Sequence, residues 1–83
     1  MEYSQIMHQV TEILADKLNL DISKIHPESQ LIGDLGMDSF GSIEVMFELE
    51  EKFGIKILEN DISKAKIVKD IADYIVAHQS AGQ

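Results

Sequence analysis

Cysteine is absent from this chain, which excludes disulfide bonds, thiolate metal sites and a thiol nucleophile of its own. Long apolar runs are absent as well, since no window approaches the roughly 20 apolar residues that span a membrane. The first residues also lack the pattern of a secretory signal peptide. We therefore expect a cytoplasmic protein without a membrane span.

Basic residues are few: the chain has seven lysines and no arginine against fifteen aspartates and glutamates, and the formal net charge is −8. Nucleic-acid binding depends on basic side chains at the phosphates, so this balance argues against a nucleic-acid partner. It favours protein partners with basic surfaces. Residues 34–61 contain eight acids and two lysines, namely Asp34, Asp38, Glu44, Glu48, Glu50, Glu51, Glu59 and Asp61 with Lys52 and Lys56.

The 83 residues are enough for one small domain, 1–83. Apolar residues recur at helical spacing in residues 4–18 and 68–78, and no strand-like alternation persists. We predict a helix in each of these ranges and a frayed tail at 79–83. With the two helices described next, the predicted fold class is all-α, a small bundle of three longer helices and one short helix.

The second helix is predicted to begin with Asp38 as its N-cap and to end near Phe53, before a glycine. The short third helix is predicted to be capped by Asn60 or Asp61 and to reach about Ala65. The connection before the second helix holds the only proline and two of the five glycines, which opposes a long helix there.

Apolar residues recur through that long connection, residues 19–38, and predict a loop packed onto the core. They are Leu20, Ile22, Ile25, Leu31, Ile32 and Leu35. Long loops in small domains are commonly functional.

The predicted second helix carries apolar residues on two sides. The arc of Val45, Met46, Leu49 and Phe53 is expected to face the core. The opposite arc begins one residue after Ser39, and a strip rimmed by carboxylates there predicts a docking surface. That strip consists of Phe40, Ile43 and Phe47, flanked by Glu44, Glu50 and Glu51. The alternative is that Phe40 or Phe47 folds back under the loop as part of the core.

The segment 34–40, Asp-Leu-Gly-Met-Asp-Ser-Phe, leads directly into this helix. It delivers Ser39 to the first helical turn, beside the positive end of the helix dipole, where an attached phosphate would be stabilised. A role for Ser39 as a catalytic nucleophile is disfavoured, because His26 is the only candidate base on the same loop and nothing orients it.

A metal site is not predicted. A calcium loop starting at Asp34 would place Ser39 where glycine is needed and Val45 where a bidentate glutamate is needed. The three histidines lack ligand spacing along the chain; they are His8, His26 and His78.

Several motifs together resemble the acyl carrier protein family. They are Asp34-Leu35-Gly36, Asp38-Ser39, Glu44, Leu49-Glu50-Glu51 with Phe53, and Asp73-Tyr74-Ile75 near the end of the chain. The likeness covers nearly the whole sequence without gaps. Asp-Ser alone carries no information, but the combination at these spacings is specific.

By this resemblance, Ser39 carries a 4′-phosphopantetheine arm as a phosphodiester, with Asp38 as its motif neighbour. The thiol of the arm holds an acyl group as a thioester, and family members can sheathe the acyl chain between helices. The protein is then a monomeric carrier rather than an enzyme, in fatty-acid or a related specialised acyl or polyketide biosynthesis. Its implied partners are the holo-carrier synthase, which is a phosphopantetheinyl transferase, and acyl-transfer and chain-modifying enzymes with basic docking surfaces.

Two alternatives remain open: an aminoacyl or peptidyl carrier, and an acidic interaction module without a prosthetic group.

Four residues depart from the family pattern and are expected on or near the docking surface. Phe40 replaces leucine, Gly41 an acidic residue, Glu48 a small apolar residue and Ala65 a larger one. These departures leave both a general and a dedicated carrier possible.

Overall fold

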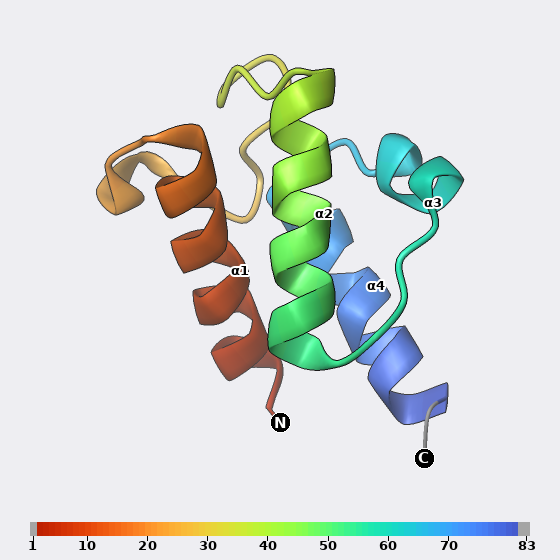
Figure 1. Cartoon of the computed structure of the whole chain (residues 1–83). Helices are drawn as coiled ribbons and strands as arrows, with labels where there is room; N and C mark the ends of the chain where they lie inside the picture. The colour runs from red at the N-terminus through yellow and green to blue at the C-terminus, as the bar shows by residue number, and fades with distance from the viewer. Residues whose placement is uncertain (1, 82–83) are drawn as a thin grey trace.

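The computed structural model describes residues 2–81, which form four α-helices, one 3₁₀ turn and no strand (Figure 1). The three longer helices are α1 (Tyr3–Leu18), α2 (Ser39–Phe53) and α4 (Val68–Ala81), and α3 (Glu59–Lys64) has six residues. The predicted all-α class, with three longer helices and one short helix, is confirmed. Within residues 2–81 no helix has the length and apolar character needed to cross a membrane.

The start of α1 and the end of α4 each lie beyond the predicted limits. Helix α1 begins one residue early because Glu2 serves as its N-cap and donates its N–H to Gln5 Oε1 at 3.1 Å. Helix α4 continues through Ala81, since the sequence offers no helix breaker before Gly82. Residues 79–81 of the predicted frayed tail are therefore helical, and 82–83 lie outside the described residues.

The start of α3 was predicted wrongly. It begins at Glu59 with Leu58, rather than Asn60 or Asp61, in the N-cap position. The N–H of Asp61 already donates to the Leu58 carbonyl at 3.0 Å within the first turn. The Asp61 carboxylate accepts a hydrogen bond from the Tyr74 hydroxyl at 2.9 Å, so it connects α3 to α4 instead of capping α3.

The core lies among the three longer helices, with α1 packed against both α2 and α4. The predicted core side of α2 is confirmed: Val45, Met46 and Leu49 are buried, and Phe53 is half-buried against the same cluster. The other helices contribute apolar residues from one face each, which are Ile6, Val10, Ile13 and Leu14 of α1 and Val68, Ile71, Ala72 and Ile75 of α4. This apolar contact fixes the position of α2, and with it the position of Ser39.

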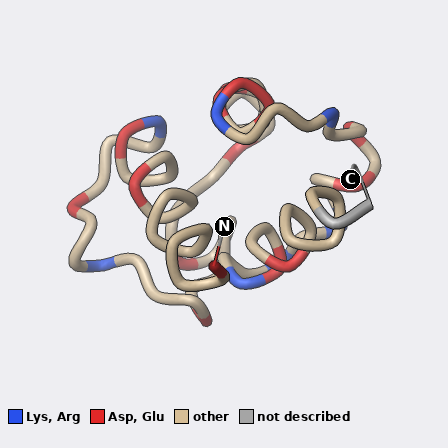
Figure 2. The backbone as a smooth tube through the Cα atoms, turned by 90° about the horizontal axis from the view of Figure 1, so that it is seen from below, with Lys and Arg blue, Asp and Glu red and all other residues tan. Residues whose placement is uncertain are grey.

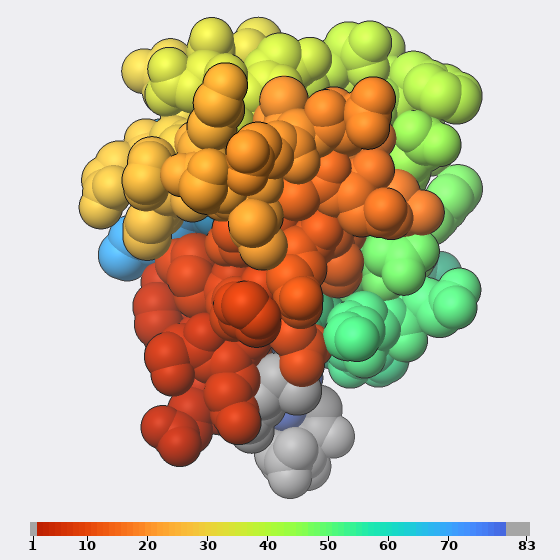
Figure 3. Space-filling view, turned by 90° about the vertical axis from the view of Figure 1, so that its left-hand side faces the viewer, coloured from red at the N-terminus to blue at the C-terminus, as the bar shows by residue number. Residues whose placement is uncertain are grey.

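The long loop lies over the end of the bundle where α1 ends and α2 begins, as the space-filling view shows (Figure 3). It contains a 3₁₀ turn at Ile22–Lys24. Backbone hydrogen bonds connect it to the start of α4: Leu31 N–H donates to the Lys66 carbonyl at 2.9 Å, and Val68 N–H donates to the Ser29 carbonyl at 3.1 Å. The loop is thus held against α4.

The prediction that the loop packs onto the core holds for some of its apolar residues only. Ile25, Leu31 and Leu35 are buried. Ile22 and Ile32 are 43% and 73% exposed, so the prediction was wrong for these two. Ile32 instead borders a surface hollow beside Ser39.

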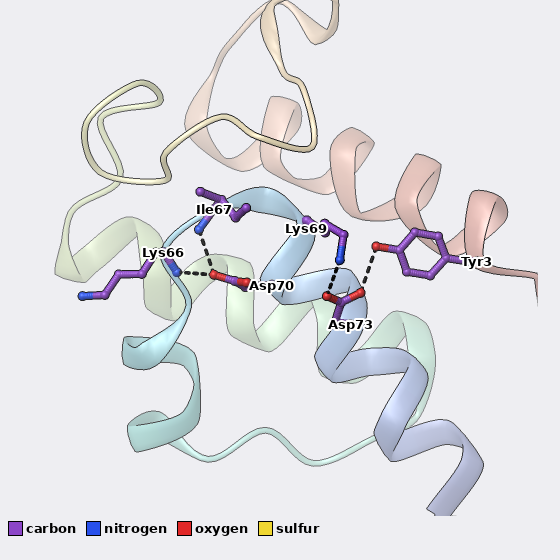
Figure 4. A network of polar contacts seen from close by, with 6 residues as sticks. All are labelled: Tyr3, Lys66, Ile67, Lys69, Asp70 and Asp73. Carbon is purple, nitrogen blue, oxygen red and sulfur yellow. Dashed lines mark hydrogen bonds and ion pairs between the residues drawn. The ribbon is translucent and has the colours of Figure 1, made fainter.

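A polar cluster joins the first residue of α1 to α4 (Figure 4). The Asp73 carboxylate accepts hydrogen bonds from the Tyr3 hydroxyl and from Lys69 Nζ, each at 2.9 Å. The pKa of Asp73 is lowered, first by the Lys69 hydrogen bond and then by Tyr3. One turn earlier, the Asp70 carboxylate accepts the N–H groups of Lys66 and Ile67 and caps the start of α4.

Candidate functional site

The loop segment before α2 is shaped by its own hydrogen bonds. The Asp34 carboxylate accepts the Gln30 N–H at 2.7 Å. Gly36 has a φ of 69°, a left-handed conformation that favours glycine. After this turn Met37 donates its N–H to the Leu31 carbonyl at 2.9 Å and buries its side chain. The chain therefore reaches the start of α2 in a fixed position.

Asp38 is the N-cap of α2, as predicted from the sequence. Its backbone is extended, and its Oδ1 accepts the Gly41 N–H at 2.7 Å. Ser39 is the first helical residue and is exposed. Ser42, one turn later, donates its hydroxyl to the Ser39 carbonyl at 2.9 Å. A phosphate on Ser39 would lie beside the positive end of a 15-residue helix.

Gly41 permits a close approach between α2 and α1. A Cβ atom at this position would lie 3.0 Å from Leu18 Cδ2 and 3.2 Å from Asp38 Oδ1. Gly41 is buried, so it faces the end of α1 rather than the docking surface, where it was expected.

An apolar hollow of about 320 Å³ opens beside Ser39. It is bounded by the loop, the first two turns of α2, and α3 with the residue that follows it. Its walls are formed by Ile32, Met37, Asp38, Ser39, Ser42, Ile43, Met46, Glu59, Ile62, Ser63 and Ala65. The sequence singled out Asp38, Ser39 and Ile43 among these residues, but it predicted a docking surface rather than a hollow and indicated nothing on the α3 side. The only signal there was Ile62, a lone apolar residue among the polar residues of α3.

Two carboxylates hold the α3 side of the hollow in place. Glu50 Oε2 accepts the Ile57 N–H at 2.8 Å, which ties α2 to the segment before α3. Asp61 Oδ2 accepts the Tyr74 hydroxyl. Burial raises the pKa of the Tyr74 hydroxyl, and the hydrogen bond to Asp61 raises it further. Tyr74 also stacks on His78, with ring centroids 3.8 Å apart.

The second apolar face of α2 is exposed. Phe40 is 71% exposed, Phe47 60% and Ile43 40%, so the alternative that Phe40 or Phe47 folds back under the loop is wrong. Glu44 and Glu51 are exposed beside this strip. We call Phe40, Ile43, Glu44, Phe47 and Glu51 the α2 strip. Glu50, assigned to the same surface from the sequence, is half-buried and bound to Ile57 N–H.

Glu48 also lies away from the α2 strip. Its Oε1 is 3.5 Å from Lys17 Nζ of α1, so it faces the same helix as Gly41. The expectation that all four departures lie on or near the docking surface is therefore wrong for these two. Phe40 belongs to the strip, and Ala65 borders the hollow beside Ser39.

Acidic residues occur in all four helices and outnumber the lysines along the chain (Figure 2). In the part of the chain that the structure describes, no three or more histidine, aspartate or glutamate side chains gather as a metal site would require. The Asp34 and Asp38 carboxylates are instead bound to backbone N–H groups of the loop and of α2.

Comparison with known proteins agrees with this geometry. Residues 8–75 match the model of a family described as "Phosphopantetheine attachment site". An acyl carrier protein of Rubrobacter xylanophilus is 38% identical over 98% of this chain and 100% of its own length. One of Thermosynechococcus vestitus is 40% identical over 90% of this chain and 93% of its own. One of Clostridium acetobutylicum is 38% identical over 88% and 95%.

The residues around Ser39 fit the group that these relatives imply, because an exposed hydroxyl at a helix start and an adjoining apolar hollow are both present. The protein is accordingly a carrier with a covalently attached 4′-phosphopantetheine and a substrate of a phosphopantetheinyl transferase, and it is not an enzyme. The chain belongs to the acyl carrier protein family, whose members share the phosphopantetheine attachment domain.

Proposed function

We propose that Ser39 is the attachment residue and that the protein carries acyl groups as thioesters in fatty-acid or a related specialised acyl biosynthesis. The observation that carries this proposal is the apolar hollow of about 320 Å³ with Ser39 on its rim. The terminal thiol of the arm supplies the thioester bond. A tether of this kind raises the effective concentration of the cargo at successive partner enzymes.

The chemical step of attachment requires only a reachable hydroxyl from this chain, whereas docking of the transferase involves the α2 strip. Ser39 Oγ forms the new P–O bond as the pyrophosphate bond of coenzyme A breaks, with 3′-phospho-AMP leaving and the hydroxyl proton passing to the transferase. The exposed position of Ser39 allows this approach. The N-terminal end of α2 then stabilises the resulting phosphodiester anion.

The hollow favours an acyl cargo over an aminoacyl or peptidyl cargo. Ile32, Ile43 and Ile62 contribute to its walls. A hydrocarbon chain gains free energy on leaving water for such a surface, whereas peptide groups lose hydrogen bonds there. The interaction-module alternative leaves both the hollow and the serine at its rim without a role.

The α2 strip supports docking to basic partner surfaces. Exposed phenylalanines provide apolar contact area, and Glu44 and Glu51 provide charge beside them. Charges at the rim of an interface act chiefly on the association rate. The proposed partners are the phosphopantetheinyl transferase and the acyl-transfer and chain-modifying enzymes of the pathway.

The first experiment is intact-mass measurement after incubation with coenzyme A and a phosphopantetheinyl transferase. We expect one arm per chain in the wild type and none in Ser39→Ala. Ser42→Ala is the matched control, because it removes a hydroxyl one turn away and should still be modified. An unmodified wild type, alongside a modified reference carrier, would contradict the proposal and favour the interaction module.

The second experiment measures the rate of that modification in Glu44→Lys/Glu51→Lys. We expect about a tenfold slower association, and a wild-type rate that falls as salt concentration rises. Glu12→Lys is the control, since Glu12 is an exposed residue of α1 outside the strip. Equal rates in all three proteins, independent of salt, would show that the acids of the strip serve solubility only.

A further inference from the structure

Three hollows of the surface border on one small side chain, Ala65, which follows the last residue of α3. The first is the hollow beside Ser39. The second, of about 340 Å³, lies between α3 and α4, and the third, of about 310 Å³, lies against the loop. Ala65 is half-buried, and its backbone φ of −70° and ψ of 129° suit any side chain. The methyl group is therefore not required by backbone geometry.

The first two hollows have Ile62 and Ala65 in common among their walls. Ile62 is half-buried, and α3 contains no buried residue. Beyond these two shared residues, the hollow between α3 and α4 reaches the buried side chains of Ile57, Ile71 and Ile75. Charged residues also line this hollow, namely Asp61, Lys64, Asp70 and Asp73. The apolar residues Ile62 and Ala65 thus lie between the hollow beside Ser39 and three buried isoleucines.

The third hollow does not reach the core. None of its lining residues is buried, and they include Gln30, Ser63 and Lys66. A hydrocarbon gains free energy by leaving water for apolar surface, and the hollow between α3 and α4 offers three buried isoleucines. The hollow between α3 and α4 is therefore the favoured continuation for a long chain.

We propose that Ala65 sets the length of the acyl chain that this carrier shelters. The inference rests on the proposed function and concerns the same site. A short chain attached through Ser39 is contained in the first hollow, and a longer one continues past the Ala65 methyl into the hollow between α3 and α4. A larger side chain at position 65 separates the two hollows and leaves the end of a long chain in water.

The test compares the wild type, Ala65→Val and Ala65→Leu. Each protein is loaded with saturated acyl groups from butyryl to palmitoyl, using acyl-coenzyme A and the transferase, and its melting temperature is measured. Each methylene that becomes buried should raise the melting temperature by about 3 °C. The chain length at which the melting temperature stops rising should be longest in the wild type, shorter in Ala65→Val and shortest in Ala65→Leu. Ala77→Leu is the control, because Ala77 is exposed on α4 and borders none of the three hollows.

A second measurement follows the release of the acyl group by hydroxylamine, which reports how far the loaded chain is drawn into the protein. Long-chain thioesters should be released several-fold faster from Ala65→Leu than from the wild type, with equal rates for butyryl. Identical chain-length profiles in loaded wild type, Ala65→Val and Ala65→Leu would overturn the inference and leave the proposed function intact. Failure to load any of the proteins at Ser39 would overturn both.

Discussion

Helices α1 and α3 lie on opposite sides of α2 in Figure 1, and they are held there by different means. Helix α1 has four buried apolar residues and packs against both α2 and α4. Helix α3 has no buried residue. It is held by the hydrogen bond from Tyr74 to Asp61, and the segment before it is held by the hydrogen bond from Ile57 N–H to Glu50. The hollows beside Ser39 and between α3 and α4 both lie on the α3 side.

Under the proposed function, this difference assigns the stability of the domain to the α1 side and the binding of the cargo to the α3 side. Elements with few buried contacts open locally at a lower free energy than the global unfolding of the domain. A carrier must admit and release its cargo repeatedly, and the α3 side can do so while α1, α2 and α4 remain packed. Substitutions on the two sides should therefore have unequal effects, which the following experiments measure.

The largest difference is expected between Leu49→Ala and Ile62→Ala. Leu49 is fully buried on the core side of α2, and its truncation should lower the free energy of unfolding by about 3 kcal/mol. Ile62 is half-buried at the hollow, and the same truncation there should cost about 1 kcal/mol. Urea denaturation measures both values. Equal losses would mean that α3 belongs to the cooperative core.

A smaller effect is expected where α1 meets the start of α2. Gly41→Val places a side chain against Leu18 and should cost about 2 kcal/mol through overpacking. Glu51→Val is the control for placing valine in this helix, because Glu51 is exposed. Thermal melting of both variants gives the comparison. A Gly41→Val protein as stable as the control would show that the two helices can move apart without loss.

The contrast between the two sides also marks the limit of prediction from the sequence. The buried arc of α2, the N-cap Asp38 and the exposed strip all follow from residue spacing along one helix. Gly41 and Glu48 could not be placed in this way, because their contacts with Leu18 and Lys17 depend on how α1 crosses α2. Local spacing contains no information on that crossing.

Helix α3 shows the same limit. Its start was misplaced because Asp61 appeared suitable as a cap, while its actual partner is Tyr74, thirteen residues later. Likewise, nothing in the sequence distinguished buried Leu31 from exposed Ile32, since their directions are set by the hydrogen bonds between the loop and the residues around the start of α4. The sequence therefore singled out residues on the α2 side, such as Ser39 and Ile43, but did not predict the hollow between them and α3.

A matched pair of tyrosines tests the two sides with the same chemical change. Tyr74→Phe removes the half-buried hydrogen bond to Asp61 and should cost about 1 kcal/mol. Tyr3→Phe removes an exposed hydrogen bond to Asp73 and should cost less than about 0.5 kcal/mol. Hydrogen exchange should show faster exchange of the α3 amides in Tyr74→Phe only. Faster exchange throughout the protein would contradict a local role for this contact.

The smallest effect is expected at the exposed cluster of Tyr3, Lys69 and Asp73. The pKa of Asp73 is lowered in the folded protein by the hydrogen bonds from Lys69 and Tyr3, relative to an ordinary value of 3.8. A lowered pKa means that Asp73 contributes stability above pH 3.8, and that this contribution is lost as the pH falls through the folded-state pKa. Asp73→Asn should therefore melt a few degrees at most below the wild type at pH 7, and this gap should close under strongly acidic conditions.

Repeating the Asp73→Asn measurement in a Lys69→Gln protein tests whether its pH dependence arises from the cluster. Because the Lys69 hydrogen bond is the largest cause of the lowered Asp73 pKa, its removal should shrink the effect of Asp73→Asn and the dependence of that effect on pH. The measurement is a double-mutant cycle: melting curves of the wild type, Asp73→Asn, Lys69→Gln and the double variant are recorded at neutral and acidic pH. An Asp73→Asn effect that is the same at both pH values would assign the contact between α1 and α4 to packing alone. The α1 side would then be held by apolar packing alone, and the α3 side by the hydrogen bonds to Asp61 and Glu50.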